Sequence, residues 1–204
     1  MQNSTLWRTL LGVDKTIVET VDLDVETGNL VASVGLTASM RNRCGARRKR
    51  CPRYDAGDGR RRWRSLDAGS VQNHLEAAAP RVSCRVHGVT VDAVPWARHQ
   101  SGHTLFFDDQ VAWLATQTSK TAITVLMCVA WRTVGAIITR VWADTEKQFD
   151  QFAGLTRIGI DEISYKRGHK YLTCVVDHDS GRLVWAALGQ DKATLATFLD
   201  ALGP

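Results

Sequence analysis

The segment IGIDEIS places two neighbouring carboxylates, Asp161 and Glu162, in a stretch that otherwise has the apolar pattern of a buried β-strand over residues 157–164. A buried carboxylate suffers a desolvation cost, which a bound divalent cation compensates. Two such cations about 4 Å apart activate the attacking oxygen and stabilise the leaving oxygen in phosphoryl transfer. Because side chains alternate along a strand, the two carboxylates point to opposite faces and are not expected to share the same metals.

A second group of residues has ligand types suited to zinc. Cys84 and His87 enclose two residues, the spacing with which a tight turn directs two ligands at one Zn²⁺ ion. Cys44 and Cys51 have six residues between them, and a loop can bring both near that pair. A site of all four would stabilise a small arginine-rich module that has little core. The alternative is a degenerate site with buried thiols and no metal.

The other cysteine and histidine residues give weaker signals. Five cysteines, irregularly spaced in a chain without a secretion signal, argue against a disulfide framework and for reduced thiols. His99 and His103 would face one metal if they lay on a helix, but a nearby Gly and Pro predict a loop. We therefore interpret these two histidines as linker residues.

Positive charge is concentrated in one segment. Residues 41–64 hold eleven of the 26 basic residues and two of the 21 acidic ones, a local charge of +9, so the rest of the chain carries −4. Such a concentration costs self-repulsion unless a polyanion neutralises it, which makes double-stranded DNA the expected partner. A solvated basic loop is the alternative. The candidate DNA contacts here are Arg47, Arg48, Lys49, Arg50, Arg60, Arg61 and Arg62.

Residues 105–152 contain no Pro and one Gly, and apolar residues at helical spacing predict three short helices. We expect the third helix to begin after the tripeptide WRT, with Thr133 or a neighbour as its cap. A short helix, a turn and a helix with a basic outer face are typical of a helix-turn-helix, although such hairpins also occur without DNA. The candidate DNA contacts are Arg132, Thr133 and Arg140. Three tryptophans are expected in the core: Trp113, Trp131 and Trp142.

The remaining elements complete an α+β, multidomain prediction. Residues 1–98 read as short strands and turns, a small β-rich, zinc-ribbon-like module with an N-terminal extension, and residues 99–153 are the helix-turn-helix module. Residues 154–204 have three strand candidates, at 157–164, 170–177 and 182–188, followed by a helix near 191–202. A strand with a carboxylate, two hairpin-linked strands and a helix form the first βββα portion of an RNase H-like fold.

This order of modules resembles the bacterial insertion-sequence transposases of the ISL-three family, which carry an Asp-Asp-Glu catalytic triad. The stretches that carry the resemblance are CPRYDAGDGRRRWRSLD, PRVSCRVHGVTVDAVPWARHQSGHT, SKTAITVLMCVAWRTVGAII and IGIDEISYKRGHKYLTCVVDHDSGRLVWAALGQDKATLATFL. The resemblance implies binding to the element's terminal inverted repeats and Mg²⁺-dependent cutting and joining of strands. By position, Asp161 matches the first catalytic aspartate, a magnesium ligand. Cys44, Cys84 and His87 match ligands of a structural zinc ion.

The sequence departs from the family pattern in two places. The family has a second cysteine where this chain has Arg47, so tetrahedral zinc would require Cys51 instead. The family's second Asp and its Glu lie beyond the first helix of the catalytic domain, so we expect this chain to be truncated there and catalytically incomplete. Asp177 or Asp179 could approach Asp161 but match neither missing residue. A carboxylate at the start of the last helix, Asp191, is interpreted as an N-terminal helix partner.

Expectations about function, partners and cellular location follow. The function is DNA transposition, and the alternative is a non-catalytic, sequence-specific DNA-binding protein or a transposition repressor. Association with itself or with a full-length transposase is possible. The longest apolar run, AITVLMCVAW, is about half of the roughly 20 residues that a membrane span needs. We therefore expect no membrane partner and a cytoplasmic, nucleoid-associated bacterial protein.

Overall fold

The computed structural model describes residues 4–146, 148 and 150–203. Within these residues it contains five helices and three β-sheets, which confirms the predicted mixed α and β class. The chain divides into two compact units, Met1–Trp142 and Ala143–Pro204. The finer division at residues 98 and 153, and the zinc-ribbon-like and RNase H-like assignments, stay predictions.

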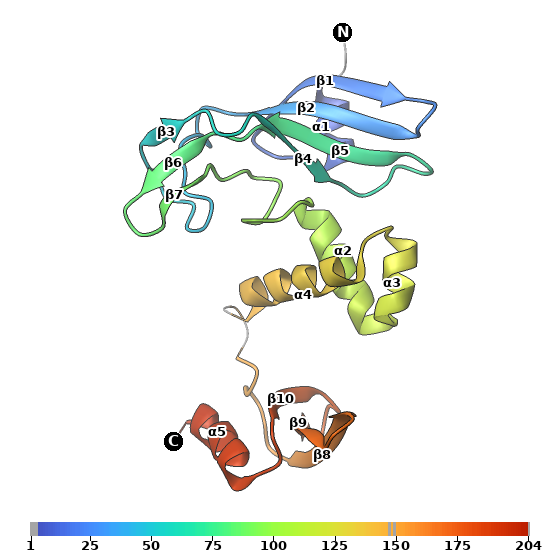
Figure 1. Ribbon diagram of the computed structural model, residues 1–204, viewed down its shortest axis with the longest axis vertical. Coiled ribbons are helices and arrows are strands. Elements are labelled where there is room, and N and C mark those ends of the chain that lie inside the picture. Colours follow the sequence, from blue (N-terminus) through green and yellow to red (C-terminus); the bar gives the residue numbers. More distant parts are fainter. Residues whose placement is uncertain (1–3, 147, 149, 204) are drawn as a thin grey trace. The chain divides into compact units, whose positions relative to one another are not determined.

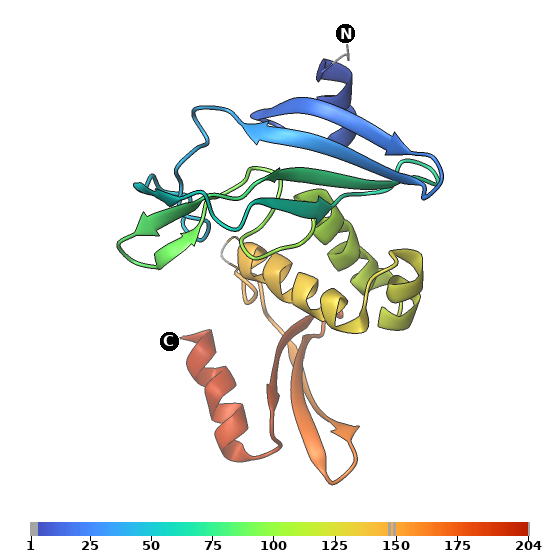
Figure 2. The ribbon, with the colours of Figure 1, turned by 45° about the horizontal axis from the view of Figure 1, so that its top comes forward.

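The first unit opens with a helix and a four-stranded sheet in the order β1-β2-β5-β4 (Figure 1). These elements are α1 (Ser4–Leu11), β1 (Thr16–Asp24), β2 (Asn29–Leu36), β4 (Arg60–Arg64) and β5 (Gln72–Ala78). The β1–β2 and β4–β5 pairs are antiparallel, whereas β2 and β5 are parallel. Helix α1 lies beside the sheet (Figure 2).

The alternation in the β2 sequence LVASVGL gives this sheet one buried face. The buried side chains of β2 are Leu30, Ala32, Val34 and Leu36. They pack with Trp63 of β4 and Leu75 of β5, and Trp96 contacts the Trp63 ring edge to face at 5.6 Å between centroids. Because strand side chains alternate, the arginines on either side of Trp63 are directed to the opposite face of the sheet.

A smaller sheet carries the Cys84 turn. Its strands are β3 (Arg53–Asp55), β6 (Arg81–Cys84) and β7 (Gly88–Val91), in the order β3-β6-β7. In the β6–β7 hairpin, Cys84 pairs with Gly88, whose φ is +66°. This left-handed conformation favours glycine, so Gly88 lets the chain turn back directly after His87.

Three helices follow, as predicted: α2 (Leu105–Gln117), α3 (Lys120–Leu126) and α4 (Trp131–Thr145). Thr104 Oγ1 caps α2 by accepting from the Phe107 amide, and Ser119 Oγ caps α3 by accepting from the Ala122 amide. The helices pack around a buried cluster consisting of Phe107, Val111, Ile123, Met127, Val134 and Ile137. Apart from Phe107, these residues are at apolar positions whose helical spacing predicted the three helices, whereas Leu126 and Ile138, at positions of the same kind, are 65% and 36% exposed.

Two details of the helical prediction are wrong. Helix α4 begins at Trp131, so Thr133 lies inside its first turn and is not the cap. The three tryptophans expected in the core are exposed: Trp113 by 60%, Trp131 by 54% and Trp142 by 51%. The smaller residues Val134 and Ile137 are the buried residues of α4, and Trp131 and Trp142 of the same helix are exposed.

The second unit has the predicted three strands and helix, namely β8 (Ile158–Lys166), β9 (Lys170–Asp177), β10 (Leu183–Leu188) and α5 (Lys192–Leu202). Its antiparallel sheet has the order β10-β9-β8. Val175, Val184 and Phe198 form the buried core, with the Trp185 ring 5.4 Å from that of Phe198. Asp191 caps α5 by accepting from the Thr194 amide at 2.8 Å, which confirms the interpretation of this carboxylate.

The expectation that the first of these strands is buried is wrong. Strand β8 is at an edge of the sheet, and every one of its residues except the half-buried Gly159 is exposed. Its apolar residues Ile158, Ile160 and Ile163 are 38%, 46% and 49% exposed. The central strand β9 supplies the burial instead, because it alone has a partner on each side.

No single helix in the described part of the chain meets the length and hydropathy needed to cross a membrane. Helices α3 and α4 meet the criteria only when taken together, and they are bent by 104° at the break between them.

Candidate functional site

Three of the four predicted zinc ligands lie together. The ligand atoms of Cys44, Cys84 and His87 are all within 4.8 Å of one another. His87 Nδ1 is 3.5 Å from Cys44 Sγ and 3.7 Å from Cys84 Sγ. Both cysteines are buried and His87 is exposed. Two sulfur atoms and one imidazole nitrogen in a small group are donors of the kind that Zn²⁺ prefers.

The backbone around Cys84 favours its charged form. The amides of His87 and Val86 donate to the Cys84 sulfur, and together with the His87 side chain they lower the pKa of Cys84 to about 6. The thiolate is the form that binds metal, and stabilising it lowers the proton competition for the site. This local arrangement follows from the tight turn at residues 84–88.

Cys51 is near the group but does not belong to the cluster of three. Burial raises its pKa, and a hydrogen bond between Cys51 and Cys84 raises it further, so the two sulfur atoms are neighbours. The Cys51 thiol also contacts the Lys49 carbonyl at 3.5 Å. Arg47, at the position where the family has a cysteine, is exposed. Cys51 therefore stays a prediction as the fourth ligand, with a placement that suits the role.

Arginines hold the loop that carries Cys44 and Cys51. Arg43 donates to the Ser39 carbonyl at 3.0 Å and to the Arg48 carbonyl at 3.1 Å. Arg48 has a φ of +54° and donates to the Ala97 carbonyl at 3.3 Å. These side chains satisfy backbone carbonyl groups of a loop that has no regular ladder, so part of the basic segment is structural.

The predicted DNA contacts of β4 also have partners inside the chain. Arg60 and Arg62 both bind Glu76, at 2.9 and 2.8 Å, and the Arg62 and Arg60 hydrogen bonds lower the pKa of that carboxyl group. Arg61 is directed to the other face, where it donates to the Ser101 carbonyl at 2.9 Å and lies 5.4 Å from the Trp63 ring. DNA contact by these three residues stays a prediction.

Other cations of the basic segment are free. Arg47, Lys49 and Arg50 are exposed, and no ion pair or side-chain hydrogen bond joins them to another described residue. They lie in the loop between Cys44 and Cys51.

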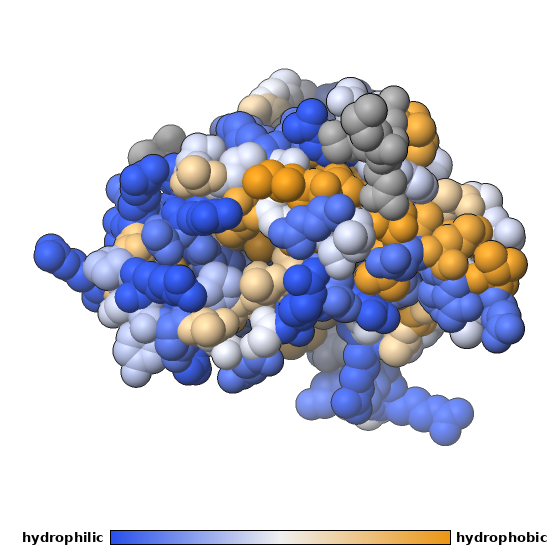
Figure 3. All heavy atoms as spheres, turned by 90° about the horizontal axis from the view of Figure 1, so that it is seen from above, coloured by the Kyte–Doolittle hydropathy of each residue, from blue (hydrophilic) through white to orange (hydrophobic). Residues whose placement is uncertain are grey.

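The face of the molecule seen in Figure 3 has broad hydrophilic areas around smaller apolar ones.

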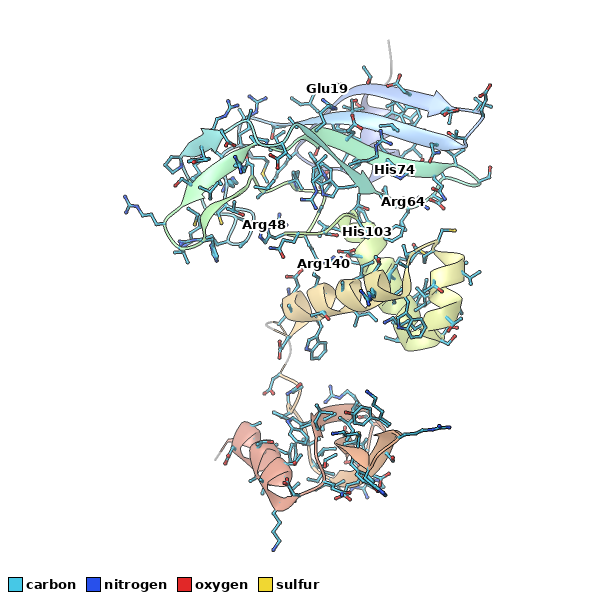
Figure 4. The ribbon with its side chains drawn as sticks, viewed as in Figure 1. Glu19, Arg48, Arg64, His74, His103 and Arg140 are labelled. Carbon is cyan, nitrogen blue, oxygen red and sulfur yellow. The ribbon has the colours of Figure 1, made fainter. Side chains whose placement is uncertain are left out.

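A buried carboxylate occupies the place where the β-strands and helices of the first unit meet. Asp108 of α2 is fully buried, and it accepts from Ser101 Oγ at 3.1 Å. Its oxygen atoms are 3.6 Å from Arg140 Nε, 3.8 Å from an Arg98 nitrogen and 3.8 Å from His103 Nδ1. Figure 4 shows Arg140 and His103 directed toward this junction. One carboxylate thus faces three basic side chains.

Burial sets the protonation states in this Asp108 cluster. It raises the pKa of Asp108 against the lowering effect of Arg140, and it lowers the pKa of His103 to about 4, with Arg140 and Arg64 acting in the same direction. His103 is therefore neutral near pH 7. This residue is not a plain linker histidine, because its ring also stacks on Phe107 at 4.8 Å.

The predicted DNA contacts of α4 are in different environments. Arg132 is exposed and Thr133 is half-buried. Arg140 lies against Asp108, and its Nε atom is buried. Sequence periodicity placed Arg140 on an outer face because Asp108 was not considered as a partner. DNA contact by Arg132 and Thr133 stays a prediction, while the placement of Arg140 favours a structural role.

Asp161 is exposed on β8, and its Oδ1 accepts from the Glu162 amide at 2.8 Å. The register pairs Asp161 with Cys174 and Glu162 with Thr173, so the two carboxylates are on opposite faces, as expected. The strand neighbours on the Asp161 face, Cys174 and then Ala186, are not metal ligands of the carboxylate type.

The acidic residues that were considered as stand-ins are engaged in a turn. Asp177 accepts from Ser180 Oγ at 2.5 Å, and Asp179 accepts from Thr156 Oγ1 at 2.6 Å and pairs with Arg157. Among the described residues, Asp161 is in no cluster of three or more potential metal-ligating side chains.

Comparison with known proteins identifies two segments. Residues 93–142, which include α2 and α3 and most of α4, match the helix-turn-helix domain of transposase family ISL3. Residues 158–204, which include β8 to α5, match a transposase domain of the same family. No solved structure matches the chain.

The whole chain is also similar to curated proteins. It is 60% identical, over 208 aligned residues, to the transposase for insertion sequence element IS1557 of Mycobacterium tuberculosis, in strains CDC 1551 and H37Rv. The alignment covers 100% of this chain and 47% of each relative, so the chain spans about half the length of the curated relatives it matches. The two domain matches, in this order, show that the chain carries a helix-turn-helix domain and a transposase segment of the ISL3 family, and the 60% identity to the IS1557 transposases agrees with them.

Proposed function

We propose that this chain binds the terminal inverted repeats of an insertion sequence and acts in DNA transposition. The proposal rests on the helix-turn-helix segment. Its second helix, α4, exposes Arg132 close to the helix N-terminus. In this motif the first residues of the second helix contact base edges in the major groove. Residues 110–143 contain no Asp or Glu, so no carboxylate of the segment opposes a DNA phosphate.

The loop of the basic segment supplies a second contact surface in this proposal. The free cations Arg47, Lys49 and Arg50 are suited to phosphate binding, which is independent of base sequence and weakens as salt rises. The arginines bound to Glu76 contribute less, because that carboxylate already compensates part of their charge.

The experiment is a binding titration of the 204-residue chain with a duplex that carries the inverted repeats flanking its own gene. We expect tighter binding than to a scrambled duplex and a steep loss of affinity with salt. Arg132→Ala should cost about 1–3 kcal/mol on the repeats and reduce the preference for them. The matched control is Arg8→Ala on α1, which should leave the preference unchanged. Equal affinity for repeat and scrambled duplexes would contradict the proposal.

A structural zinc ion in the Cys44, Cys84 and His87 group is part of the proposal, with Cys51 as the fourth ligand. When bound, zinc would join the basic loop to the β6–β7 turn and stabilise a part of the chain with few core residues. The sulfur and imidazole donors fit this ion.

Metal content measured on the purified chain tests the zinc site. We expect about one zinc per chain, lost in Cys84→Ser and retained in the control Cys128→Ser, whose thiol is exposed and outside the group. Cys51→Ser should weaken zinc binding if Cys51 is the fourth ligand. Full zinc retention in Cys84→Ser would rule the site out.

For catalysis, we propose that Asp161 is the first magnesium ligand of the family's strand-transfer site. The proposal rests on its position in the transposase match and on its exposed carboxylate. Asp161 belongs to no group of three or more potential metal-ligating side chains among the described residues, and its partner across the strands is Cys174. A second candidate function is therefore DNA binding without cleavage, as in a repressor.

A cleavage assay with Mg²⁺ and end-repeat DNA separates these two functions. If residues 1–204 bind without cutting, the duplex stays intact and Asp161→Asn binds it as tightly as the wild type. Strand cleavage that is abolished by Asp161→Asn would instead support a complete active site formed by this chain.

A further inference from the structure

Lys120, the first residue of α3, reaches across to α4. Its Nζ atom lies 4.5 Å from the centroid of the Trp131 ring. A Cβ atom added to Gly135, one turn further along α4, would be 3.2 Å from the same Nζ atom. The absence of a side chain at Gly135 therefore leaves the space that this ammonium group occupies.

This cation has no counterion in the first unit. No ion pair joins Lys120 to any described residue, and the sequence from 110 to 143 contains no carboxylate. The face of an aromatic ring attracts an ammonium group without neutralising it, and Trp is the best of the aromatic side chains in this respect. Trp131 is 54% exposed and Lys120 is half-buried, so the ring lies at the surface with the lysine partly covered beside it.

We infer that Lys120, held over the Trp131 ring, binds a backbone phosphate of duplex DNA beside α4. The inference deepens the proposed function and rests on it, because it takes α3 and α4 as the DNA-binding pair. A lysine is a compact point charge suited to phosphate. In helix-turn-helix proteins the second helix lies in the major groove while the preceding part of the motif meets the backbone at its edge.

Trp131 is a positioning residue in this inference. The Lys120 stem is flexible, and the ring fixes the ammonium group on the α4 side of α3 before DNA arrives. A phosphate contact that is formed in advance loses less side-chain entropy on binding. The two residues should therefore act as a coupled pair in DNA binding.

The first test measures the salt dependence of binding to a duplex of random sequence, since a phosphate contact does not need specific bases. Lys120→Met should weaken binding and reduce the slope of log affinity against log salt by about 0.9, the value for one phosphate. Lys120→Arg should retain the wild-type slope. Lys192→Met on α5 removes the same charge elsewhere and should leave the slope unchanged. An unchanged slope in Lys120→Met, or an equal change in Lys192→Met, would overturn the inference.

The second test is a double-mutant cycle. Trp131→Leu should weaken binding in the wild-type background and have no further effect in Lys120→Met, because the ring acts through the lysine. Trp113→Leu, which alters an equally exposed indole on α2, is the matched control and should not change affinity. Cooperative unfolding at the wild-type urea midpoint establishes that each variant is folded. Additive effects of the two substitutions would contradict the positioning role.

The outcomes distinguish this inference from the proposed function. If the wild type prefers the repeats and Lys120→Met binds like it, the inference fails and the proposed function stands. If the wild type binds the random duplex with the expected loss in Lys120→Met but has no preference for the repeats, the phosphate contact stands and the proposed sequence-specific function fails.

Discussion

Asp108 and Asp161 are carboxylates in the two different units, and their environments are the reverse of what their sequence contexts suggest. Asp161 lies in an apolar segment but is exposed on an edge strand. Asp108 lies beside a second aspartate near a helix N-terminus, a context typical of a solvated carboxylate, but it is fully buried.

The difference between the two lies in their partners. Asp108 is accompanied by Arg98, Arg140 and the neutral His103, which come from the connecting segment and α4. The two arginines compensate part of its desolvation, although burial still raises its pKa. Asp161 accepts a hydrogen bond from the adjacent amide of Glu162, and no ion pair joins it to another described residue. Asp108 is therefore buried because distant segments bring partners to it, whatever the hydropathy of its sequence neighbours.

The largest expected effect tests whether the two units are stable separately. Phe198→Ala removes the fully buried ring that packs on Trp185 and should destabilise the second unit by about 3–5 kcal/mol. Peptide-resolved hydrogen exchange should show faster exchange in residues 143–203 alone. Leu199→Ala, at a 55% exposed position, is the control. Faster exchange in α2 and α4 as well would mean that the units unfold as one.

Asp108→Asn should cause the next largest loss of stability. It leaves Arg98 and Arg140 partly buried without a full countercharge, which we expect to cost about 3 kcal/mol of unfolding free energy. The control is Asp109→Asn, which also loses a contact to Arg98 but at a side chain that is 52% exposed, so it should cost less than about 1 kcal/mol. Urea unfolding of both variants measures the difference, and equal midpoints would refute the importance of the buried cluster.

A smaller loss of stability is expected when the pH is lowered. The folded chain protonates His103 only near its pKa of about 4, whereas the unfolded chain protonates it near about 6.5. The unfolded state thus binds more protons in this range, so His103 gives full stability above about pH 6.5 and loses it as the pH falls toward 4. The wild type should lose up to about 2 kcal/mol more than His103→Gln between about pH 7.5 and about pH 5.

Urea midpoints at the two pH values check this prediction. The raised pKa of Asp108 acts with the opposite sign in the acid range and is common to both chains, so the difference between them isolates His103. His178→Gln, at an exposed turn of the second unit, should behave like the wild type. A wild-type loss that His103→Gln shares in full would contradict the assignment.

The smallest change in stability is expected for the substitution of Asp161. Asp161→Asn should leave the urea midpoint of the chain unchanged, because its side chain is exposed and no ion pair joins it to another described residue. A destabilisation as large as that of Asp108→Asn would mean that Asp161 has a structural role. Any effect of Asp161→Asn should appear only in DNA cleavage.

Sequence periodicity predicted a helix or a strand correctly where the pattern of apolar side chains fits only one type of element. The alternation in β2, the helical spacing in α2 to α4 and the strand, turn and helix order after residue 157 all reappear in the structure. Cys44, Cys84 and His87 were predicted as zinc ligands together with Cys51, and these three lie together, although 40 residues or more separate the first from the others. Residue type indicated the group because cysteine and histidine are the ligands that zinc prefers.

The errors have a common physical cause. Three predictions were inferred from residues nearby in the chain: that β8 is buried, that Trp113 and Trp142 lie in the core, and that Arg140 faces outward. Burial depends instead on which segments pack against a side chain, and a short window of sequence does not contain them. Arg140 and Asp108 are 32 residues apart and find each other only when α4 packs on α2.

By itself, the sequence determined the order of the modules, the identities of the potential ligands and the concentration of positive charge in residues 41–64, because these properties belong to single residues and their spacing. Only the tertiary structure decided which charges are compensated. It paired Arg60 and Arg62 with Glu76, placed Arg140 against Asp108, and left Lys120 over Trp131 with no ion pair to another described residue. Electrostatic interactions act through space between distant parts of the chain, so the free cations of a DNA-binding surface are defined by the fold.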